Sequence, residues 1–393
     1  MCSNTNSDSS NGIINGSSSS AGNGATPLAD PAVGSDTWKR EVEGPYRRLD
    51  ANPDALELAR LVFCAVTIVP IRAILIGLFL LSYYTTARCF LAVAPDRPWA
   101  HAVNIYMVRM GSWVLLWLIG CTVEVKGLRE NAGRRGEPRV FVSNHISYLE
   151  ILYFLAELGP SFVMKRTCLR VPFIGDIAAR VLDSVSVDNK GGKEGGKGSE
   201  AIAARLQCMF GEKALATGES DATDTDTGAV ASEPWGQGWR GNPLVIFPEG
   251  TTSNGSCLLR FKTGVFAGGV PVHPIVIQYD WRRFSPAFES IFFPVHALRL
   301  LAEPVTRLRV EFLPVCCPTA EHRADRTLYA KAVQQIFCKA TGLPPVESMY
   351  ADKTKYHTYL RDQFNAHPWG RAAVLLPAPD QHMASLRARA KIA

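Results

Sequence analysis

The stretch FVSNHISYLEILYF, residues 141–154, joins a strand-like run to a helix-like run. It starts with apolar residues, and the apolar residues after Tyr148 recur at the spacing of a helix face. The junction carries polar side chains, with His145 and Glu150 five positions apart. An apolar strand that ends in polar residues and leads into a helix is typical of an α/β fold.

The same alternation continues along the chain. We expect strands at 140–142, 162–164, 185–187, 244–247, 272–277 and 308–312, and helices at 149–157, 173–182, 200–215 and 325–340. The third of these helices carries apolar residues on one face, namely Ile202, Leu206, Met209 and Phe210. The pattern therefore predicts an α/β fold with a mixed sheet flanked by helices.

Composition divides the chain into four expected parts. Residues 1–45 are expected to be a disordered tail, because the first thirty-five or so are mainly Ser, Asn and Gly and cannot repay the entropy of ordering. Residues 46–125 contain two apolar pieces and are expected to associate with a membrane. The α/β domain is expected over 126–345, with surface insertions at 189–198 and 216–242, and a C-terminal extension over 346–393.

The first apolar piece, LVFCAVTIVPIRAILIGLFLLS at 61–82, would form roughly 33 Å of helix at about 1.5 Å per residue, enough to cross a bilayer core of about 30 Å. Arg72 at its centre costs about 2.5 to 3.5 kcal/mol in lipid, and Pro70 kinks the helix. A full span and a bent helix that enters and returns therefore both stay open. A buried helix of a soluble core is the third alternative.

The second apolar piece, MGSWVLLWLIGCTV at 110–123, is short for a span. It is expected either to lie in the membrane interface, with Trp113 and Trp117 at headgroup depth, or to be an ordinary core helix. The N-terminal tail lacks the basic start and apolar centre of a secretory signal. We therefore expect an integral or monotopic protein of the endoplasmic reticulum or another endomembrane, with its folded domain in the cytosol.

Net charge, cysteine spacing and one loop motif argue against several classes of function. The net charge of +6 is mild for 393 residues and does not indicate a nucleic-acid partner. The ten cysteines form no CxxC pair and no Cys/His cluster of zinc spacing, so free thiols and no metal site are expected. GGKEGGK at 191–197 has the spacing of a phosphate-binding loop, but Gly198 follows where Ser or Thr is needed, so nucleotide hydrolysis is not expected.

His145 and Glu150 can form a general-base pair. If His145 lies in the loop and Glu150 in the first helical turns, the carboxylate folds back onto the imidazole. It then fixes the tautomer and raises the basicity of the other ring nitrogen, which can take a proton from a hydroxyl. The alternative is structural: His145 caps the helix, and Glu150 is a solvated acid favoured by the helix dipole.

A second polar cluster follows the strand expected at 244–247. PEGTTSNG at 248–255 supplies glycines, hydroxyls and one acid, and LLRFKTG at 258–264 adds two cations. Loops at the ends of strands are where α/β folds bind ligands. The loop is therefore expected to bind a ligand, since a plain turn would need fewer polar groups.

Three blocks, SNHISYLE, FPEGTTSNG and GVPVHPIVIQY, stand in the order that identifies the glycerolipid acyltransferases using acyl-CoA: NHxxxxD, FPEGT and a final V-x-P-V-type strand. The chain resembles that family over about residues 60–290. The extended run FPEGTTSNGSCLLRFKTGVFAGGVPVHPIVIQY, with VPIR in the first apolar piece, is most similar to the lysophosphatidylcholine and lysophosphatidylethanolamine acyltransferase branch.

This resemblance implies site residues. His145 would be the catalytic base, Glu150 its charge-relay partner, and Glu249 and Gly250 part of an acceptor-binding loop. The full expected substrate-binding set is Asn144, Ser147, Lys165, Arg166, Phe247, Pro248, Glu249, Gly250, Thr251, Thr252, Asn254 and Lys262, with no metal ligand. The implied partners are acyl-CoA as co-substrate, a lysophospholipid and the membrane, with no nucleic acid and no bound cofactor.

The chain departs from the family pattern at three places. Glu150 stands where Asp is usual, Thr252 where many lysophosphatidic acid acyltransferases carry Arg, and Asn189 with Lys190 where they carry another Arg. Arginine forks bind phosphate monoester dianions, so their absence favours a diester acceptor, lysophosphatidylcholine or lysophosphatidylethanolamine. The alternative is a 1-acylglycerol-3-phosphate acyltransferase in which Arg166, Arg170 or Lys262 supplies the fork.

The implied chemistry is direct transfer. His145 would deprotonate the acceptor hydroxyl, and the oxygen would attack the thioester of acyl-CoA. A lipid hydrolase is the competing enzyme class, but the sequence contains no GxSxG elbow. A non-catalytic membrane scaffold is the competing class without activity.

Overall fold

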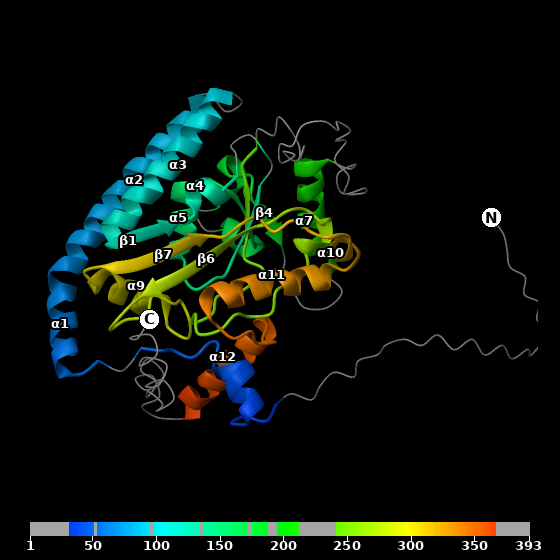
Figure 1. Cartoon of the computed structure of the whole chain (residues 1–393). Coiled ribbons are helices and arrows are strands. Elements are labelled where there is room, and N and C mark those ends of the chain that lie inside the picture. The colour runs from blue at the N-terminus through cyan, green and yellow to red at the C-terminus, as the bar shows by residue number, and fades with distance from the viewer. Residues whose placement is uncertain are drawn as a thin grey trace, which may run out of the picture.

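The computed structural model describes residues 31–50, 53–93, 98–133, 137, 139–170, 175, 177–187, 195–211 and 241–366. Within these ranges a seven-stranded sheet has the order β1-β7-β6-β2-β5-β3-β4 (Figure 1). Neighbouring strands are parallel except for the antiparallel pair β6 and β7. The strands are β1 (Cys121–Lys126), β2 (Val140–Ser143), β3 (Ser161–Lys165), β4 (Val185–Val187), β5 (Leu244–Ile246), β6 (His273–Asp280) and β7 (Thr306–Phe312). The predicted mixed α/β sheet is confirmed.

Helices cover both faces of this sheet, with α3 and α5 on one face and α7 and α11 on the other. The helices of the described residues are η1 (Trp38–Glu43), α1 (Ala55–Val66), α2 (Ile68–Val93), α3 (Pro98–Ile119), α4 (Leu128–Asn131), α5 (Leu149–Glu157), η2 (Arg166–Arg170), η3 (Ile177–Val181), α7 (Gly195–Phe210), η4 (Phe266–Gly268), α9 (Phe293–Ala302), α10 (Ala320–Ala324), α11 (Arg326–Thr341) and α12 (Tyr350–Ala366).

The two cores follow from the alternation of side chains along the central strands. Val140 and Val142 of β2 pack on one face with residues of α7 and α11. Phe141, between them in sequence, packs on the other face with residues of α3 and α5. Because both faces are covered, β2 has four buried residues in succession.

The expected strands are confirmed as β2 to β7, and the helices expected at 149–157 and 325–340 as α5 and α11. The helix expected at 200–215 is present as α7, which begins earlier, at Gly195. Of the helix expected at 173–182, the structure describes residues 175 and 177–182, and 177–181 form η3. Most of the insertions expected at 189–198 and 216–242 lies outside the described residues, as do Asn189, Lys190 and much of the Gly/Lys run at 191–197.

The apolar piece at 110–123 was wrongly expected to be one segment. It contains the end of α3 and the start of β1, and Gly120 separates them with a φ of 84° that favours glycine. Trp113 packs edge-on against Tyr153 of α5 at 6.2 Å, whereas Trp117 is 76% exposed. Helix α3 thus contacts the domain with one side and exposes apolar side chains on another.

The first apolar piece, in which Pro70 was predicted to cause a kink, forms two helices that meet just before Pro70. Helix α1 ends at Val66 and α2 starts at Ile68. In a continuous helix the carbonyl oxygen of Val66 would accept the N–H of residue 70, which a proline lacks. Figure 1 shows α2 continuing from α1 at an angle along one side of the molecule, with α3 beside α2. Residues 55–89 and 102–119 are long and apolar enough to cross a membrane, by length and composition.

Arg72 of α2 binds the folded domain. Its guanidinium donates to the carbonyl oxygens of Leu301 at 2.8 Å, Glu303 at 2.7 Å and Pro304 at 3.0 Å. These carbonyls lie at the C-terminal end of α9, where carbonyl groups lack helical partners and the dipole favours a cation. The charge that opposed a membrane span therefore has a binding site on the protein.

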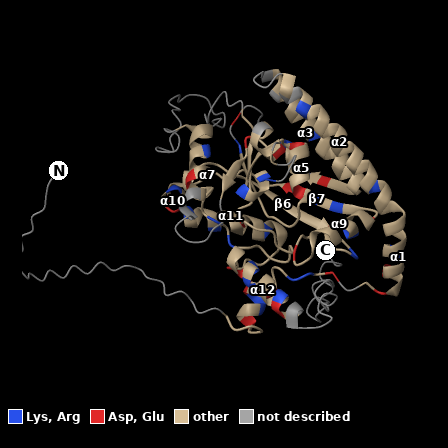
Figure 2. Cartoon of the chain, turned by 180° about the vertical axis from the view of Figure 1, so that it is seen from behind, with Lys and Arg blue, Asp and Glu red and all other residues tan. Residues whose placement is uncertain are grey.

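The side of α1, α2 and α3 that faces away from the domain is apolar. Its exposed side chains include Val62, Phe63, Val66, Ile71, Ile74, Leu75, Leu78, Leu81, Tyr106, Met110 and Trp117. Figure 2 shows these helices largely free of Lys, Arg, Asp and Glu, in contrast to α12. The segment that was expected to associate with a membrane thus forms an apolar layer of helices on one side of the domain.

The disordered tail expected over 1–45 is wrong for residues 31–45. Trp38, Val42 and Tyr46 are buried and pack with Tyr356 of α12 and Leu259. These large apolar side chains follow the Ser/Gly-rich run, and burying them stabilises the ordered segment. Residues 1–30 and, in the C-terminal extension, 367–393 lie outside the described residues.

Candidate active site

The site lies at the carboxyl ends of three adjacent strands. β2 pairs in parallel with β6 on one side and with β5 on the other. His145 follows β2, Phe247 follows β5, and Tyr279 lies at the end of β6. Since parallel strands end at the same edge of a sheet, the chain brings these residues together there.

His145 and Glu150 are in contact. His145 Nδ1 lies 2.9 Å from Glu150 Oε1, and the same oxygen accepts the backbone N–H groups of Ile146 at 2.6 Å and Ser147 at 2.7 Å. Because α5 begins at Leu149, Glu150 stands in its first turn and its side chain folds back over the preceding loop. Glu150 is fully buried, so it is not the solvated acid of the alternative interpretation.

Tyr279 contributes a contact that the sequence did not reveal. Its hydroxyl donates to Glu150 Oε2 at 2.5 Å. Burial raises the pKa of Tyr279 well above its ordinary value, so the phenol keeps its proton and remains a donor. The tyrosine belongs to the block GVPVHPIVIQY, where its position near the end of a strand was the available signal.

The imidazole of His145 is held on one face and accessible at its edge. It stacks on the ring of Phe247 with centroids 4.0 Å apart and planes 18° apart. Its side chain is 17% exposed, and across the described ranges Nε2 has no hydrogen-bond partner. With Nδ1 occupied by Glu150, Nε2 is the atom that can take a proton from a substrate hydroxyl.

Glu249 holds the two motif loops together. Its Oε2 accepts the backbone N–H of His145 at 2.9 Å, and its Oε1 accepts that of Leu259 at 3.0 Å. Burial raises the pKa of Glu249 to about 8, while these two hydrogen bonds lower it. The acid of the FPEGT block is therefore directed into the protein and positions the His145 backbone.

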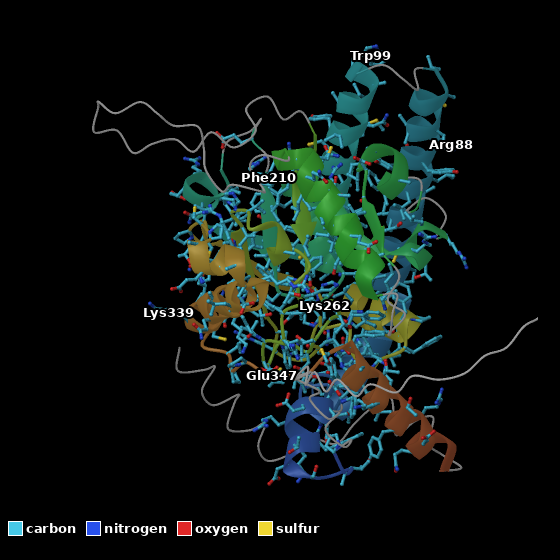
Figure 3. All side chains as sticks on the ribbon, turned by 90° about the vertical axis from the view of Figure 1, so that its right-hand side faces the viewer. Arg88, Trp99, Phe210, Lys262, Lys339 and Glu347 are labelled. Atoms are coloured by element: carbon cyan, nitrogen blue, oxygen red, sulfur yellow. The ribbon has the colours of Figure 1, made fainter. Side chains whose placement is uncertain are left out.

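Gly250 allows a cation to approach the loop. Its φ is 68°, and a Cβ at this position would collide with the side chain of Lys262. Burial lowers the pKa of Lys262, and the positive charge of Lys165 lowers it further. Figure 3 shows Lys262 in the middle of the packed domain.

Lys165 lies over the ring of Tyr350, with Nζ 4.2 Å from the ring centroid. No carboxylate lies within ion-pair distance of Lys165 or Lys262 among the residues that the structure describes. Two cations that repel each other and lack an acidic partner among these residues form a place where an anion is favourable. We refer to Lys165 and Lys262 as the lysine pair.

The other expected residues range from buried to exposed positions. Asn144 is buried and exchanges hydrogen bonds with the backbone of Ile277 at 2.8 and 2.9 Å. Asn254 donates to the carbonyl oxygens of Gly44 and Arg47 at 2.6 and 2.8 Å. Ser147 is fully buried and the Pro248 carbonyl accepts from Lys262 N. Thr251 and Thr252 are half-buried, and Arg166 is exposed.

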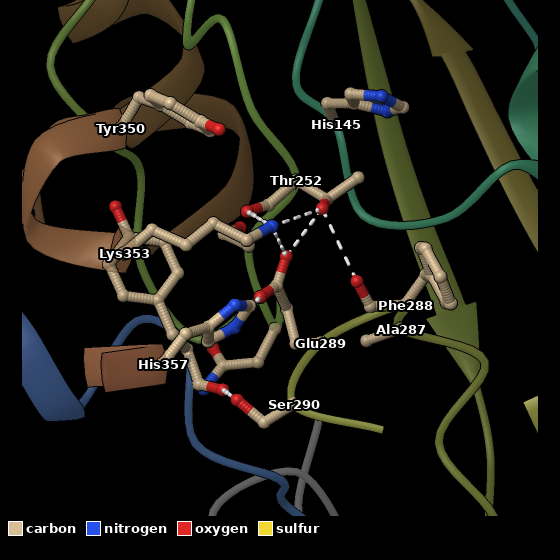
Figure 4. A network of polar contacts seen from close by, with 12 residues as sticks. His145, Thr252, Ala287, Phe288, Glu289, Ser290, Tyr350, Lys353 and His357 are labelled. Atoms are coloured by element: carbon tan, nitrogen blue, oxygen red, sulfur yellow. Dashed lines mark hydrogen bonds and ion pairs between the residues drawn. The ribbon is translucent and has the colours of Figure 1, made fainter. Parts of the chain in front are cut away.

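No group of three or more His, Cys, Asp or Glu side chains suited to a metal ion occurs in the described part of the chain. The described side chains of the site offer a base, His145, an acid that orients it, Glu150, and the lysine pair. Thr252 contacts Glu289 and Lys353 instead of an arginine (Figure 4). These groups suit proton removal from a hydroxyl beside an anion.

Comparisons with known proteins agree with this chemistry. The chain is 31% identical over 349 residues to the lysophospholipid acyltransferase LPEAT1 of Arabidopsis thaliana, covering 77% of this chain and 81% of that protein. It is 27% identical to the lysophospholipid acyltransferase LPCAT4 of Xenopus tropicalis and 24% identical to lysophosphatidylcholine acyltransferase 2 of Rattus norvegicus, covering 82% and 75% of this chain. It spans about half the length of these two, 58% and 49%.

The crystal structure of the 1-acyl-sn-glycerophosphate acyltransferase PlsC from Thermotoga maritima is similar to 72% of this chain and 97% of its own, with a TM-score of 0.43 and 16% identity. The sequence model of the family described as Acyltransferase matches residues 123–278, which contain His145, Glu150 and the FPEGT block. On the strength of the Arabidopsis relative and this match, the chain belongs to the acyltransferase family.

Proposed function

We propose that the protein is a membrane-associated lysophospholipid acyltransferase that takes its acyl group from acyl-CoA. The observation that supports this most directly is the contact of His145 Nδ1 with Glu150 Oε1 at 2.9 Å, which leaves Nε2 for a substrate. The relatives at 24–31% identity are named for the acylation of lysophospholipids. A lysophospholipid supplies the free hydroxyl that such a base would deprotonate.

In the proposed reaction, Nε2 of His145 takes the proton of the acceptor hydroxyl. The oxygen attacks the thioester carbonyl, and nearby N–H groups or cations stabilise the tetrahedral oxyanion. The C–S bond breaks, the ester is formed, and the imidazolium returns its proton to the leaving thiolate. Glu150 stabilises the imidazolium in between, and the reaction needs neither a metal nor a bound cofactor.

The decisive experiment uses the full-length protein with acyl-CoA and lysophosphatidylcholine. An acyltransferase forms the diacyl product and releases CoA only when the acceptor is present. A thioesterase or a lipase hydrolyses its own substrate without any acceptor and forms no diacyl product. His145→Ala should lower the rate about 10²-fold or more. His322→Ala on α10, away from these strand ends, is the control and should keep its activity.

The acceptor class is part of the proposal. The lysine pair provides positive charge for a phosphate, but no arginine follows FPEGT at Thr252. We therefore expect lysophosphatidylcholine or lysophosphatidylethanolamine to have a higher kcat/KM than lysophosphatidic acid. A preference of more than about tenfold for lysophosphatidic acid would favour the second candidate, a 1-acylglycerol-3-phosphate acyltransferase.

The membrane contact is proposed to be the apolar side of α1, α2 and α3, on the endoplasmic reticulum or another endomembrane, with the domain in the cytosol. The binding of Arg72 to α9 supports a layer that lies on or dips into the membrane while α2 stays attached to the domain. Membrane sedimentation tests this. The wild type should resist extraction by high salt, and complete extraction would contradict the attachment.

A further inference from the structure

Thr252 lies at the edge of the site. The next residue, Ser253, donates its backbone N–H to the carbonyl oxygen of His145 at 2.9 Å. The Thr252 hydroxyl donates to Glu289, and Lys353 Nζ donates to the same hydroxyl at 2.8 Å. Figure 4 shows Thr252 between His145 on one side and the Lys353–Glu289 contact on the other.

All the donors of Lys353 are used inside the protein. Its ammonium donates to Thr252 Oγ1 at 2.8 Å, to the Thr252 carbonyl oxygen at 3.4 Å, and to Glu289 Oε1. An ammonium has three N–H donors, so a ligand finds none of them free. The side chain is 13% exposed.

Glu289 cancels the charge of this lysine. Its side chain is fully buried, and a buried carboxylate beside an ammonium forms a pair without net charge. Its second oxygen, Oε2, makes no hydrogen bond to any described residue, and the Nε2 atom of His357 lies 3.8 Å from it. The positive charge beside Thr252 is thus neutralised from within.

The position of Lys353 is fixed by the helix that carries it. Tyr350 and Lys353 lie three residues apart on α12, and Tyr350 contacts Lys165 of the lysine pair. Trp38 packs edge-on against Tyr359 of the same helix at 5.7 Å. Helix α12 is therefore docked against the site by its own apolar contacts, and the Lys353–Glu289 pair is part of that docked face.

We propose that the buried Lys353–Glu289 pair determines which acceptors the enzyme accepts. Because the pair is neutral, the acceptor site gains no additional positive charge next to Thr252. A phosphate monoester carries close to two negative charges near neutral pH and a diester carries one, so a site without that charge favours the diester. This inference rests on the proposed function and names the part of the chain that sets its acceptor class.

The test replaces Glu289→Gln in the full-length protein. The glutamine keeps the size of the side chain and an oxygen for Lys353, but leaves the ammonium charge without its counter-charge. The ratio of kcat/KM for lysophosphatidic acid to that for lysophosphatidylcholine should rise about tenfold, the order expected for one additional unit charge near the phosphate. If the Lys353–Glu289 contact were only structural, its loss would lower kcat/KM for both acceptors together.

Two further variants test the opposite change in the kcat/KM ratio and the return to an uncharged pair. Lys353→Met leaves the charge of Glu289 unpaired, so the ratio should fall. The double variant Glu289→Gln with Lys353→Met is neutral again and should return the ratio to within about twofold of wild type. Glu347→Gln is the control: this carboxylate is exposed, precedes α12 and should leave the ratio unchanged.

The outcomes separate this inference from the function on which it rests. A wild type that acylates no lysophospholipid overturns both. An active wild type whose ratio stays within about twofold in both single variants overturns the role of the pair alone. If Glu289→Gln shows no cooperative thermal transition, Lys353→Met and the double variant decide, because the ratio must fall in the first and return in the second.

Discussion

Glu150 uses both oxygens of its carboxylate. Oε1 contacts the ring of His145 and accepts the N–H groups of Ile146 and Ser147, and Oε2 accepts the hydroxyl of Tyr279. These contacts fix a side chain that is one methylene longer than the aspartate usual in its family. The helix begins at Leu149, so the longer side chain has a turn of loop backbone to fold over.

Substitutions at position 150 should separate charge from shape. Glu150→Gln should lower kcat by about 10²-fold or more, because an amide cannot stabilise the imidazolium and directs an N–H₂ group at backbone donors. Glu150→Asp should stay within about tenfold of wild type, because the charge is kept. Steady-state kinetics with lysophosphatidylcholine measures both, and equal activity of the glutamine variant would remove the relay role.

Tyr279→Phe tests the hydroxyl that holds Glu150. We expect a fall in kcat of about tenfold with little change in KM, and a shift of the acid limb of the pH–rate profile to higher pH. The shift follows because the carboxylate, without the phenol donor, interacts more strongly with the imidazolium. Tyr153→Phe is a matched control, since the buried Tyr153 hydroxyl has no partner among the described residues. If the pH–rate profile of Tyr279→Phe does not shift, the tyrosine has only a packing role.

His296 predicts a pH dependence of stability. Burial, with the charge of Arg48, lowers its pKa to about 4; Nδ1 lies 3.0 Å from the hydroxyl of Tyr148, and Nε2 lies 3.1 Å from the carbonyl oxygen of Pro286. The folded pKa is below the usual value, so the unfolded chain binds the proton first. The contribution of neutral His296 to the free energy of unfolding is therefore complete above about pH 6.5. It is lost as the pH falls toward 4, and the loss is roughly 3 kcal/mol at most.

Denaturant unfolding between pH 4 and 7 measures this effect. His296→Gln can still accept and donate a hydrogen bond but does not titrate. Its free energy of unfolding should depend less steeply on pH over this range than that of the wild type. Parallel curves for the two proteins would show that other groups carry the pH dependence.

The sequence predicted the residues of the site that are close together in the chain. His145 and Glu150 were predicted because five positions span a strand-to-helix turn. Tyr279 lies 129 positions from Glu150, and Lys353 lies 101 positions from Thr252. Their contacts depend on the order of the strands and on the docking of α12, and no local pattern contains that information.

At the scale of elements, α2 is attached to the domain through Arg72. Its guanidinium binds carbonyl oxygens at the end of α9, and Gly120 leaves room for it, because a Cβ there would meet the guanidinium. Apolar packing alone would hold α2 less specifically, since its other side faces away from the domain and is equally apolar. The arginine therefore defines which side of α2 faces the protein.

Arg72→Leu should destabilise the attachment of α2. Each hydrogen bond to a charged group contributes about 1.5 to 3 kcal/mol, so the thermal midpoint in detergent should fall by several degrees. The carbonyl oxygens at the end of α9 would lose their donor at the same time. Arg88→Leu, at an exposed position near the other end of α2 (Figure 3), is the control and should change the midpoint less. Equal midpoints in the two variants would contradict the role of Arg72.

The elements that the sequence missed have weak local patterns. β1 follows the apolar end of α3 without a polar break, so its residues looked like part of the helix. Helix α12 contains Asp352, Lys353 and Lys355 among its first residues and has no continuous apolar stripe. Its position comes from a few aromatic contacts with the N-terminal segment, which is distant in sequence. Strands with apolar runs, such as β2 and β5, were predictable because both faces of the sheet are covered.

In the whole molecule, the two ends of the folded chain meet over the FPEGT loop. The Asn254 side chain donates to the carbonyl oxygens of Gly44 and Arg47, and its backbone N–H donates to that of Pro45 at 2.8 Å. The hydroxyl of Tyr46 bonds Ser348, just before α12. The segment 38–48 thus connects the loop that carries Thr252 to the helix that carries Lys353.

Truncation tests this connection. A chain that starts at residue 31 should keep the activity of the full-length protein, because it retains the segment 38–48. A chain that starts at residue 49 should remain bound to membranes through α1, α2 and α3, but should lose most of its transferase activity. The physical reason is that Asn254 loses three backbone acceptors and Trp38 and Tyr46 no longer cover α12. Acylation assays on membrane fractions measure both properties in one preparation. If the shorter chain sediments and acylates like the longer one, the loop is held by the domain itself, and the contacts of the N-terminal segment contribute only to stability.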